Sequence, residues 1–164
     1  MKIAARTIIW AVLLFLPTSL LHAQKLGEGQ LVAAAQEFID GCDANVKLIS
    51  TKLSESAGFQ LNTNLRSLEY LDDFVTRVLA GEDKEKFGSL PSVIGCFLGQ
   101  VIISEIGGKW MKSTEFGYAV ELKGGTMAFP FNTSYDHLVN GPEDSILGFF
   151  NAFKAISENG LKTD

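Results

Sequence analysis

The stretch PSVIGCFLGQVIISEIGG, residues 91–108, decides the fold. It begins with a proline, which suits the first turn of a helix, and ends with a glycine pair, which suits a helix end. Between these limits the apolar residues fall on every face of a helix. A helix that is apolar all round is a buried one, so residues 91–106 are predicted to form the central helix of the domain. Gly95 and Gly99 would let a neighbouring helix or a sheet approach closely.

Two further helices are predicted upstream of this centre. Apolar residues recur at helical intervals across residues 29–53, which indicates one helix or two pieces divided near Gly41. The division is considered because glycine destabilises a helix interior by about 1 kcal/mol relative to alanine. Residues 54–64 are rich in Ser, Gly and Asn and are predicted as a loop. A second amphipathic helix is predicted over residues 65–79, with Gly81 as its stop.

Downstream of the central helix the apolar pattern changes to alternation. Residues 110–113, 116–122 and 126–131 are predicted as antiparallel strands, the last two joined by the hairpin sequence KGG. A short helical turn at residues 135–139 and a last helix that starts at GPED, residues 141–144, complete the domain. The predicted fold class is α+β, a three-stranded antiparallel meander packed against about four helices.

The first 23 residues have the organisation of a secretory signal peptide. Lys2 and Arg6 supply a positive start, residues 8–16 form an unbroken apolar run, and Ala23 is a small residue at the expected cleavage point. The apolar run is far shorter than the ~20 residues that a membrane-spanning helix needs, which disfavours an uncleaved anchor. We therefore expect residues 24–164 to form a single domain in the periplasm or outside the cell, without a stable membrane anchor.

Signal cleavage would make the chain more acidic. The full sequence has 14 Lys and Arg residues against 19 Asp and Glu residues, a net charge of -5. Two of the basic residues and none of the acidic ones lie in residues 1–23, so the expected mature chain has a net charge of -7. An acidic protein lacks the positive field that holds phosphate backbones, which argues against a nucleic-acid partner and in favour of a basic one.

The two cysteines are predicted to form a disulfide. Cys42 lies on the apolar stripe of the first helix and Cys96 lies in the central helix, so both side chains are expected to face the core. An exported protein folds in an oxidising compartment, where such a pair becomes a bridge. The alternative is two buried free thiols, because cysteine also serves as a small core residue.

Two residues are weak candidates for catalysis, His137 and Glu105. His137 closes the run SYDH, residues 134–137, which holds the residue types of a nucleophilic triad. Residues this close along the chain rarely converge in a triad's geometry, so a surface or helix-capping histidine is the alternative. Glu105 interrupts the apolar central helix near its end. Its alternative is a carboxylate that is exposed or paired with Lys109.

No cofactor or metal site is predicted. One histidine in the expected mature chain and two cysteines expected to be bridged cannot supply three or four nitrogen and sulfur ligands for zinc. The acidic pairs at residues 72–73 and 143–144 lack the alternating spacing of a calcium loop.

Four segments resemble a group of small exported bacterial domains of unknown function. They are, in chain order, YLDDFV, GCFLGQVIISEIGGKW, FPF and VNGPEDSILGFF. The resemblance covers about residues 68–153. It implies a helix with a small-residue pattern that runs into a glycine-tryptophan turn, then a meander, a proline-phenylalanine strand and a helix start at NGPEDS. It implies no activity, so no catalytic residue is transferred.

These observations favour a non-catalytic exported protein that binds another protein or a small ligand. One version is an inhibitor or immunity-type protein whose acidic surface masks a basic site on an enzyme or toxin. The first alternative is a small periplasmic hydrolase that uses His137 or carboxylates from separate helices, such as Glu105. The second alternative is an envelope structural factor.

Overall fold

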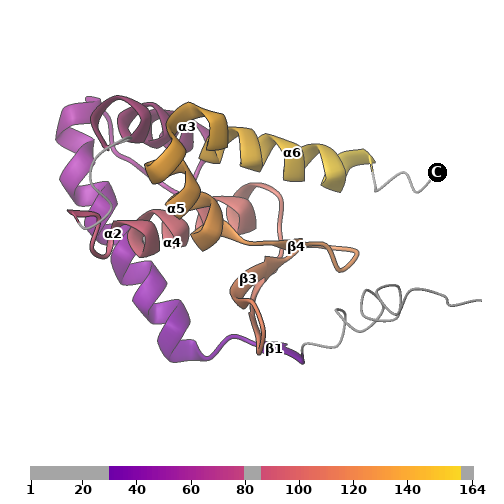
Figure 1. Ribbon diagram of the computed structural model, residues 1–164. Coiled ribbons are helices and arrows are strands. Elements are labelled where there is room, and N and C mark those ends of the chain that lie inside the picture. Colours follow the sequence, from indigo (N-terminus) through magenta and orange to yellow (C-terminus); the bar gives the residue numbers. More distant parts are fainter. Residues whose placement is uncertain (1–29, 80–85, 160–164) are drawn as a thin grey trace, which may run out of the picture.

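The computed structural model describes residues 30–79 and 86–159, and within them the fold is α+β (Figure 1). The expected signal peptide and the Gly81 helix stop lie outside the described residues. In chain order the elements are β1 (Leu31–Ala33), α2 (Gln36–Ala57), α3 (Leu65–Phe74), the π-helical turn η1 (Val75–Leu79), α4 (Leu90–Glu105), β2 (Lys109–Ser113), β3 (Gly117–Glu121), β4 (Met127–Ala128), α5 (Pro130–Asn140), the 3₁₀ turn η3 (Gly141–Asp144) and α6 (Ile146–Asn159).

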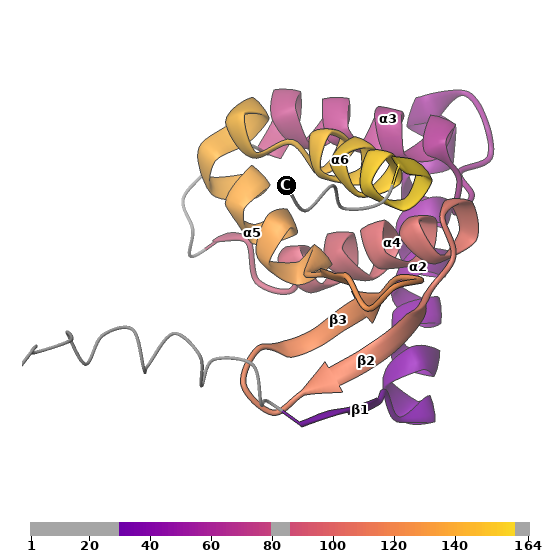
Figure 2. The same ribbon diagram turned by 90° about the vertical axis from the view of Figure 1, so that its right-hand side faces the viewer.

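Helix α4 is the centre of the domain, which confirms the prediction from its sequence. It contacts α2, α3, α5, α6 and strand β3. Helices α4 and α5 lie between the sheet on one side and the outer helices α3 and α6 on the other (Figure 2). Every residue from Val93 to Gly99 is buried, as expected for a helix that meets protein on all sides.

The two glycines of α4, Gly95 and Gly99, are each in close contact with a different neighbouring element. A Cβ atom on Gly95 would lie 2.5 Å from Cδ1 of Phe131, at the start of α5. A Cβ atom on Gly99 would overlap the ring of Trp110, which belongs to β2. The GxxxG pattern therefore lets a helix approach at one glycine and the sheet at the other.

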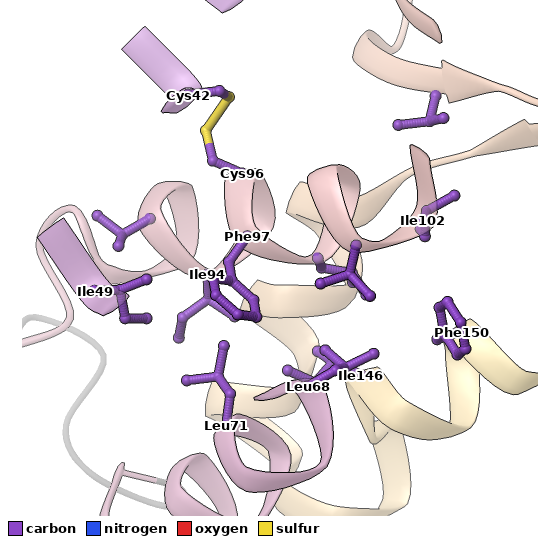
Figure 3. Close-up of a cluster of buried hydrophobic side chains, with 14 of the residues drawn as sticks. Cys42, Ile49, Leu68, Leu71, Ile94, Cys96, Phe97, Ile102, Ile146 and Phe150 are labelled. Atoms are coloured by element: carbon purple, nitrogen blue, oxygen red, sulfur yellow. A yellow bond between two sulfur atoms is a disulfide. The ribbon is translucent and has the colours of Figure 1, made fainter. Parts of the chain in front are cut away.

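The core brings together side chains from four helices. Figure 3 shows Cys42 and Ile49 of α2, Leu68 and Leu71 of α3, Ile94, Cys96, Phe97 and Ile102 of α4, and Ile146 and Phe150 of α6. Burying one Leu, Ile or Phe side chain contributes about 1.5–3 kcal/mol relative to leaving it exposed. Of the helices in residues 30–79 and 86–159, none combines the length and apolar character needed to span a membrane.

The sheet has a strand that the sequence did not indicate. Its order is β1-β2-β3-β4 with every pair antiparallel, so β1 adds a fourth strand to the predicted meander. The prediction of a helix from residue 29 is wrong because residues 31–33 pair with β2 instead of starting the helical stripe. Helix α2 begins at Gln36, runs through Gly41 without a break, and continues past the predicted loop start. It ends before Gly58, whose φ of 71° is the left-handed conformation that glycine adopts without strain.

The third predicted strand is mostly wrong. Strand β4 has two residues, and Pro130 opens α5 instead of lying in a strand. Proline has no N–H to give to a sheet and its fixed φ suits the first turn of a helix, which explains the change. The proline-phenylalanine strand implied by the resemblance is therefore not formed. The segment GPED forms the turn η3, and α6 begins only at Ile146.

Candidate functional site

The predicted disulfide is present. Cys42 of α2 is bonded to Cys96 of α4, and both residues are buried. The Nδ2 atom of Asn45, one helical turn after Cys42, lies 3.8 Å from Sγ of Cys96 and donates to it. The bridge fixes α2 against the central helix at the base of a surface groove.

This groove has a volume of about 600 Å³ and lies between α2, the first turns of α4 and α5, and the start of β3. We call it the aromatic groove because its lining includes four aromatic side chains, those of Phe38, Phe116, Tyr118 and Phe131. Three polar side chains, those of Asn45, Ser92 and Asn132, share the lining. Four separate elements thus contribute to one surface hollow.

Phe38 contacts two of the other aromatic side chains that line the groove. Its ring stacks on Tyr118 at 3.5 Å between centroids and meets Phe131 edge-on at 6.0 Å. It also meets Trp110, the buried residue that packs on Gly99, at 5.3 Å. Such aromatic pairs contribute about 0.5–1.5 kcal/mol beyond area burial, so the contacts of Phe38 help to hold α2 against β2, β3 and α5. Phe116 is different, because it is 52% exposed.

Local features of the chain keep the groove open. Gly41 lies on α2 at the groove, and a Cβ atom added there would meet no atom within 4 Å. The turn that carries Phe116 is held by Ser113, whose hydroxyl oxygen accepts the N–H groups of Glu115 at 3.2 Å and Phe116 at 3.1 Å. The phenylalanine is therefore positioned by the backbone although its ring is exposed.

The groove is equipped for contact and hydrogen bonding. All of its lining lies within the described residues, and Tyr118 is the one lining residue with an ionisable side chain, since both cysteines are bonded. General acid–base reactions most often use histidine, a carboxylate or lysine, and none of these side chains lines the groove. The lining favours binding over catalysis.

His137 lies elsewhere, in the interior between α3, α5 and α6. It is 0% exposed, so of the two expected alternatives to a catalytic role, a surface histidine and a helix-capping one, the first is wrong. Its Nδ1 atom accepts the N–H of Ile146, the first residue of α6, at 3.4 Å, and its Nε2 atom lies 2.9 Å from the hydroxyl of Thr76. An oxygen of Asp72 lies 3.6 Å from Nδ1. The imidazole thus accepts a backbone N–H at the start of α6.

A hydroxyl, an imidazole and a carboxylate lie next to one another here as in a nucleophilic triad, in the order Thr76, His137 and Asp72. The proton of the imidazole, however, is on the nitrogen that faces Thr76. Because Nδ1 accepts a backbone N–H, the neutral ring carries its proton on Nε2 and donates it to Thr76. A catalytic base must instead accept the hydroxyl proton at that nitrogen. Burial lowers the pKa of His137, and the nearby carboxylates of Asp72 and Asp144 only oppose that effect, so the ring is neutral at pH 7.

Asp72 completes this buried network. Its Oδ1 atom accepts the hydroxyl of Ser145 at 2.8 Å and the N–H of Leu147 at 3.1 Å. The hydroxyl oxygen of Ser145 accepts the N–H of Gly148 at 2.9 Å, the bond expected of a helix N-cap. The sequence reasoning missed this role, although a serine directly before an apolar helical run is the signal for it.

The other residues singled out from the sequence do not assemble into a catalytic set. Ser134 donates its hydroxyl to the carbonyl of Pro130 at 2.7 Å, one turn back in its own helix. Glu105 is exposed at the end of α4, and Lys109 pairs with Glu121 at 3.2 Å. No hydrogen bond or ion pair joins Glu105 to His137 in the part of the chain that the structure describes. Within that same part, no group of three or more His, Cys, Asp or Glu side chains is arranged to hold a metal ion.

A second hollow is acidic. It has a volume of about 400 Å³ and lies between α5, η3 and the start of α6. Asp136, Glu143 and Asp144 line it together with Phe149, and none of its lining residues is basic. The side-chain amide of Asn140 donates to the carboxylate of Asp144 at 2.6 Å. Asp136 and Glu143 are exposed to solvent. We call this feature the acidic hollow.

Comparisons of the chain with models of protein families, with curated proteins and with solved structures give no significant match. The resemblance to small exported bacterial domains therefore rests on its sequence segments alone. The function has to be argued from the groove, the hollow and the buried network.

Proposed function

We propose that this protein is an exported, non-catalytic binding protein and that the aromatic groove holds its ligand. The observation that carries the proposal is the lining of the groove, which combines four aromatic rings with two amides and the hydroxyls of Ser92 and Tyr118. A volume of about 600 Å³ lies within the usual range of ligand pockets, roughly 300–1,000 Å³. Aromatic rings supply contact area, and amides supply donors and acceptors that orient a ligand.

Export is supported by two independent features. The first 23 residues have the charge, apolar run and small terminal residue of a signal peptide. The Cys42–Cys96 bond is the kind of crosslink that persists outside the cytoplasm, where thiols are not kept reduced. Intact mass spectrometry of the exported protein tests this part, with a chain that starts at Gln24 as the expected result.

The hydrolase alternative has less support. Its best candidate, His137, is fully buried and carries its proton on the nitrogen that would have to accept one. The aromatic groove, which is the larger of the two hollows described above, contains no carboxylate and no histidine. A binding role needs neither.

The acidic hollow supports a second, more specific version, in which the partner presents a basic surface. Three carboxylates in a hollow whose lining holds no basic residue attract a cationic side chain, and charge of this kind speeds association at low salt. This is the version in which the protein masks a basic site as an inhibitor or immunity-type protein. Capture of partners from envelope extract by the variant D136N/E143Q should then lose its salt dependence. The control E37Q/E158Q removes two exposed charges outside the hollow and should keep it; equal loss in both would contradict this version.

Site-specific photo-cross-linking tests the groove directly. A photoreactive phenylalanine analogue replaces Asn132, which is exposed and lines the groove, and in a matched control it replaces Asn151, which is exposed on α6. Intact mass then reports adducts with proteins or with small ligands formed in the producing cells. We expect adducts from position 132 and none from position 151. Equal yields, or adducts from position 151 alone, would contradict the proposal.

A further inference from the structure

We infer that the ligand of the aromatic groove is an extended, uncharged polypeptide segment that joins the sheet as an additional strand beside Tyr118. This inference rests on the proposed binding role of the groove and adds the class of ligand. It depends on the edge that strand β3 presents to the groove.

Three of the five residues of β3, from Gly117 to Ala119, have no strand partner on the side of β4 among the described residues. Strand β2 pairs with all five residues of β3, from Gly117 to Glu121. Strand β4 pairs only with Val120 and Glu121. Continuing the register of Val120 with Ala128 would place Pro130 opposite Tyr118. Proline has no N–H to donate and here begins α5, so β4 cannot be extended along the rest of β3.

The direction of the main-chain groups follows from the hydrogen bonds around the strand. Leu122 donates its N–H to Thr126 at 2.8 Å, on the side of β4. Alternate residues of an antiparallel strand direct both main-chain groups to the same side, so Val120 and Tyr118 also face that side. The carbonyl of Trp110 accepts from Ala34 at 3.1 Å, on the side of β1, so Trp110 and Val120, which lie opposite each other, do not bond to each other. Both observations thus indicate that the main-chain groups of Val120 and Tyr118 point away from β2.

Tyr118 therefore presents an N–H and a C=O to the open side of the sheet. No hydrogen bond to either group from outside the sheet occurs among the described residues. Gly117 and Tyr118 line the aromatic groove, and Phe131 and Asn132 of α5 line it as well. An unpaired strand edge beside a groove is the arrangement by which proteins bind extended peptides: the main chain gives affinity and alternate side chains give specificity.

The groove also indicates the side chains of such a segment. Successive side chains of a strand point in opposite directions, so one would lie on the rings of Phe116 and Phe131 while the main chain reaches Tyr118. The amides of Asn45 and Asn132 offer hydrogen bonds and no charge. A segment with a bulky apolar residue and uncharged neighbours fits this lining.

A library of random short peptides displayed on phage, selected on the oxidised mature protein, supplies the probes. Each selected peptide is then synthesised with one nitrogen methylated at a time. We expect methylation of the nitrogen that faces Tyr118 to weaken binding about tenfold, the loss of one hydrogen bond, while both neighbouring nitrogens tolerate it. In the protein, G41L should fill the groove and weaken binding at least about tenfold, a change in contacts of similar size. A44L, an exposed substitution on the same helix outside the groove, should leave binding unchanged.

The outcomes separate this inference from the proposal on which it rests. Peptides that are sensitive to G41L but tolerate methylation at every nitrogen would overturn strand addition and leave the groove as a binding site. Failure to select any peptide, or peptides insensitive to G41L, would also overturn the inference. The proposed function is judged separately by the adducts formed at position 132.

Discussion

His137 holds the start of α6 only while it is neutral, and this makes the fold sensitive to pH. Burial lowers the pKa of His137, so the unfolded chain binds this proton more readily than the folded one. The stabilising contribution is complete above about pH 6.5, the ordinary value, and is lost as the pH falls through the folded pKa. We expect the free energy of unfolding in urea to fall in this window by at most about 1.4 kcal/mol per pH unit.

The variant H137Q provides the control. Glutamine keeps a hydrogen-bonding side chain at this position but does not titrate, so its stability should depend less on pH between about 7.5 and about 5. A decline as steep as that of the unsubstituted protein would show that another group is responsible.

Two glycines in helix interiors should respond to alanine in opposite ways. G99A forces a methyl group into the ring of Trp110, and overpacking of this kind destabilises by about 1–3 kcal/mol. G41A adds a methyl group where no atom lies within 4 Å, and should stabilise the protein by up to about 1 kcal/mol. Urea unfolding of both variants measures the difference. The same sign of change in both would contradict the close packing of β2 on α4.

Helix α6 depends on an aspartate from another helix. D72A removes the acceptor of two hydrogen bonds, from Ser145 and Leu147, and is expected to destabilise the protein by about 1–3 kcal/mol. D73A is the matched control, because among the described residues the side chain of Asp73 pairs with Arg77 alone, on the exposed face of α3 and η1. Exposed pairs of this kind contribute little, so D73A should leave the unfolding midpoint nearly unchanged. Equal effects of D72A and D73A would contradict the capping role.

The disulfide joins α2 to the central helix and closes a loop with a sequence separation of 54 residues. Replacing both cysteines by alanine is expected to destabilise the protein by about 2–4 kcal/mol, because the unfolded chain gains freedom. Urea unfolding of the double variant, compared with the oxidised protein, measures this. Unchanged stability would show that the bond constrains little.

The elements with a strong local pattern were predictable. Helix α4 follows from apolar residues on every face, and β2 and β3 follow from alternation. Strand β1 did not, because three apolar residues before a helix fit the helical stripe as well as a strand, and only pairing with β2 decides between them. Pro130 was ambiguous in the same way, because proline suits both the end of a strand and the first turn of a helix. In the structure the residues after it form α5, so Pro130 begins a helix.

The candidate site was less predictable than the fold. The disulfide was predictable from the apolar positions of both cysteines together with the expected export of the chain. Asn45, Tyr118 and Asn132 carry no sequence signal, because they come from α2, β3 and α5 and meet only when α4 lies between the sheet and the outer helices. The role of His137 also depends on partners far along the chain, Thr76 and Ile146.

At the scale of the whole molecule we propose different roles for the acidic charge and for the groove. The expected mature chain has a net charge of -7, which favours association with basic partners without fixing where they bind. The aromatic groove is lined by residues that carry no charge at neutral pH. It is the place that we propose for the ligand, and it lies where the disulfide fixes α2 against the central helix α4.

Photo-cross-linking from position 132 in two groove variants tests the central claim, that the groove is the binding site, most directly. G41L narrows the groove and A44L adds the same side chain to the same helix outside it. The account predicts that G41L strongly lowers the yield of the adduct while A44L leaves it unchanged. Urea unfolding of both variants checks that they are folded. An adduct that forms equally in both variants would contradict it.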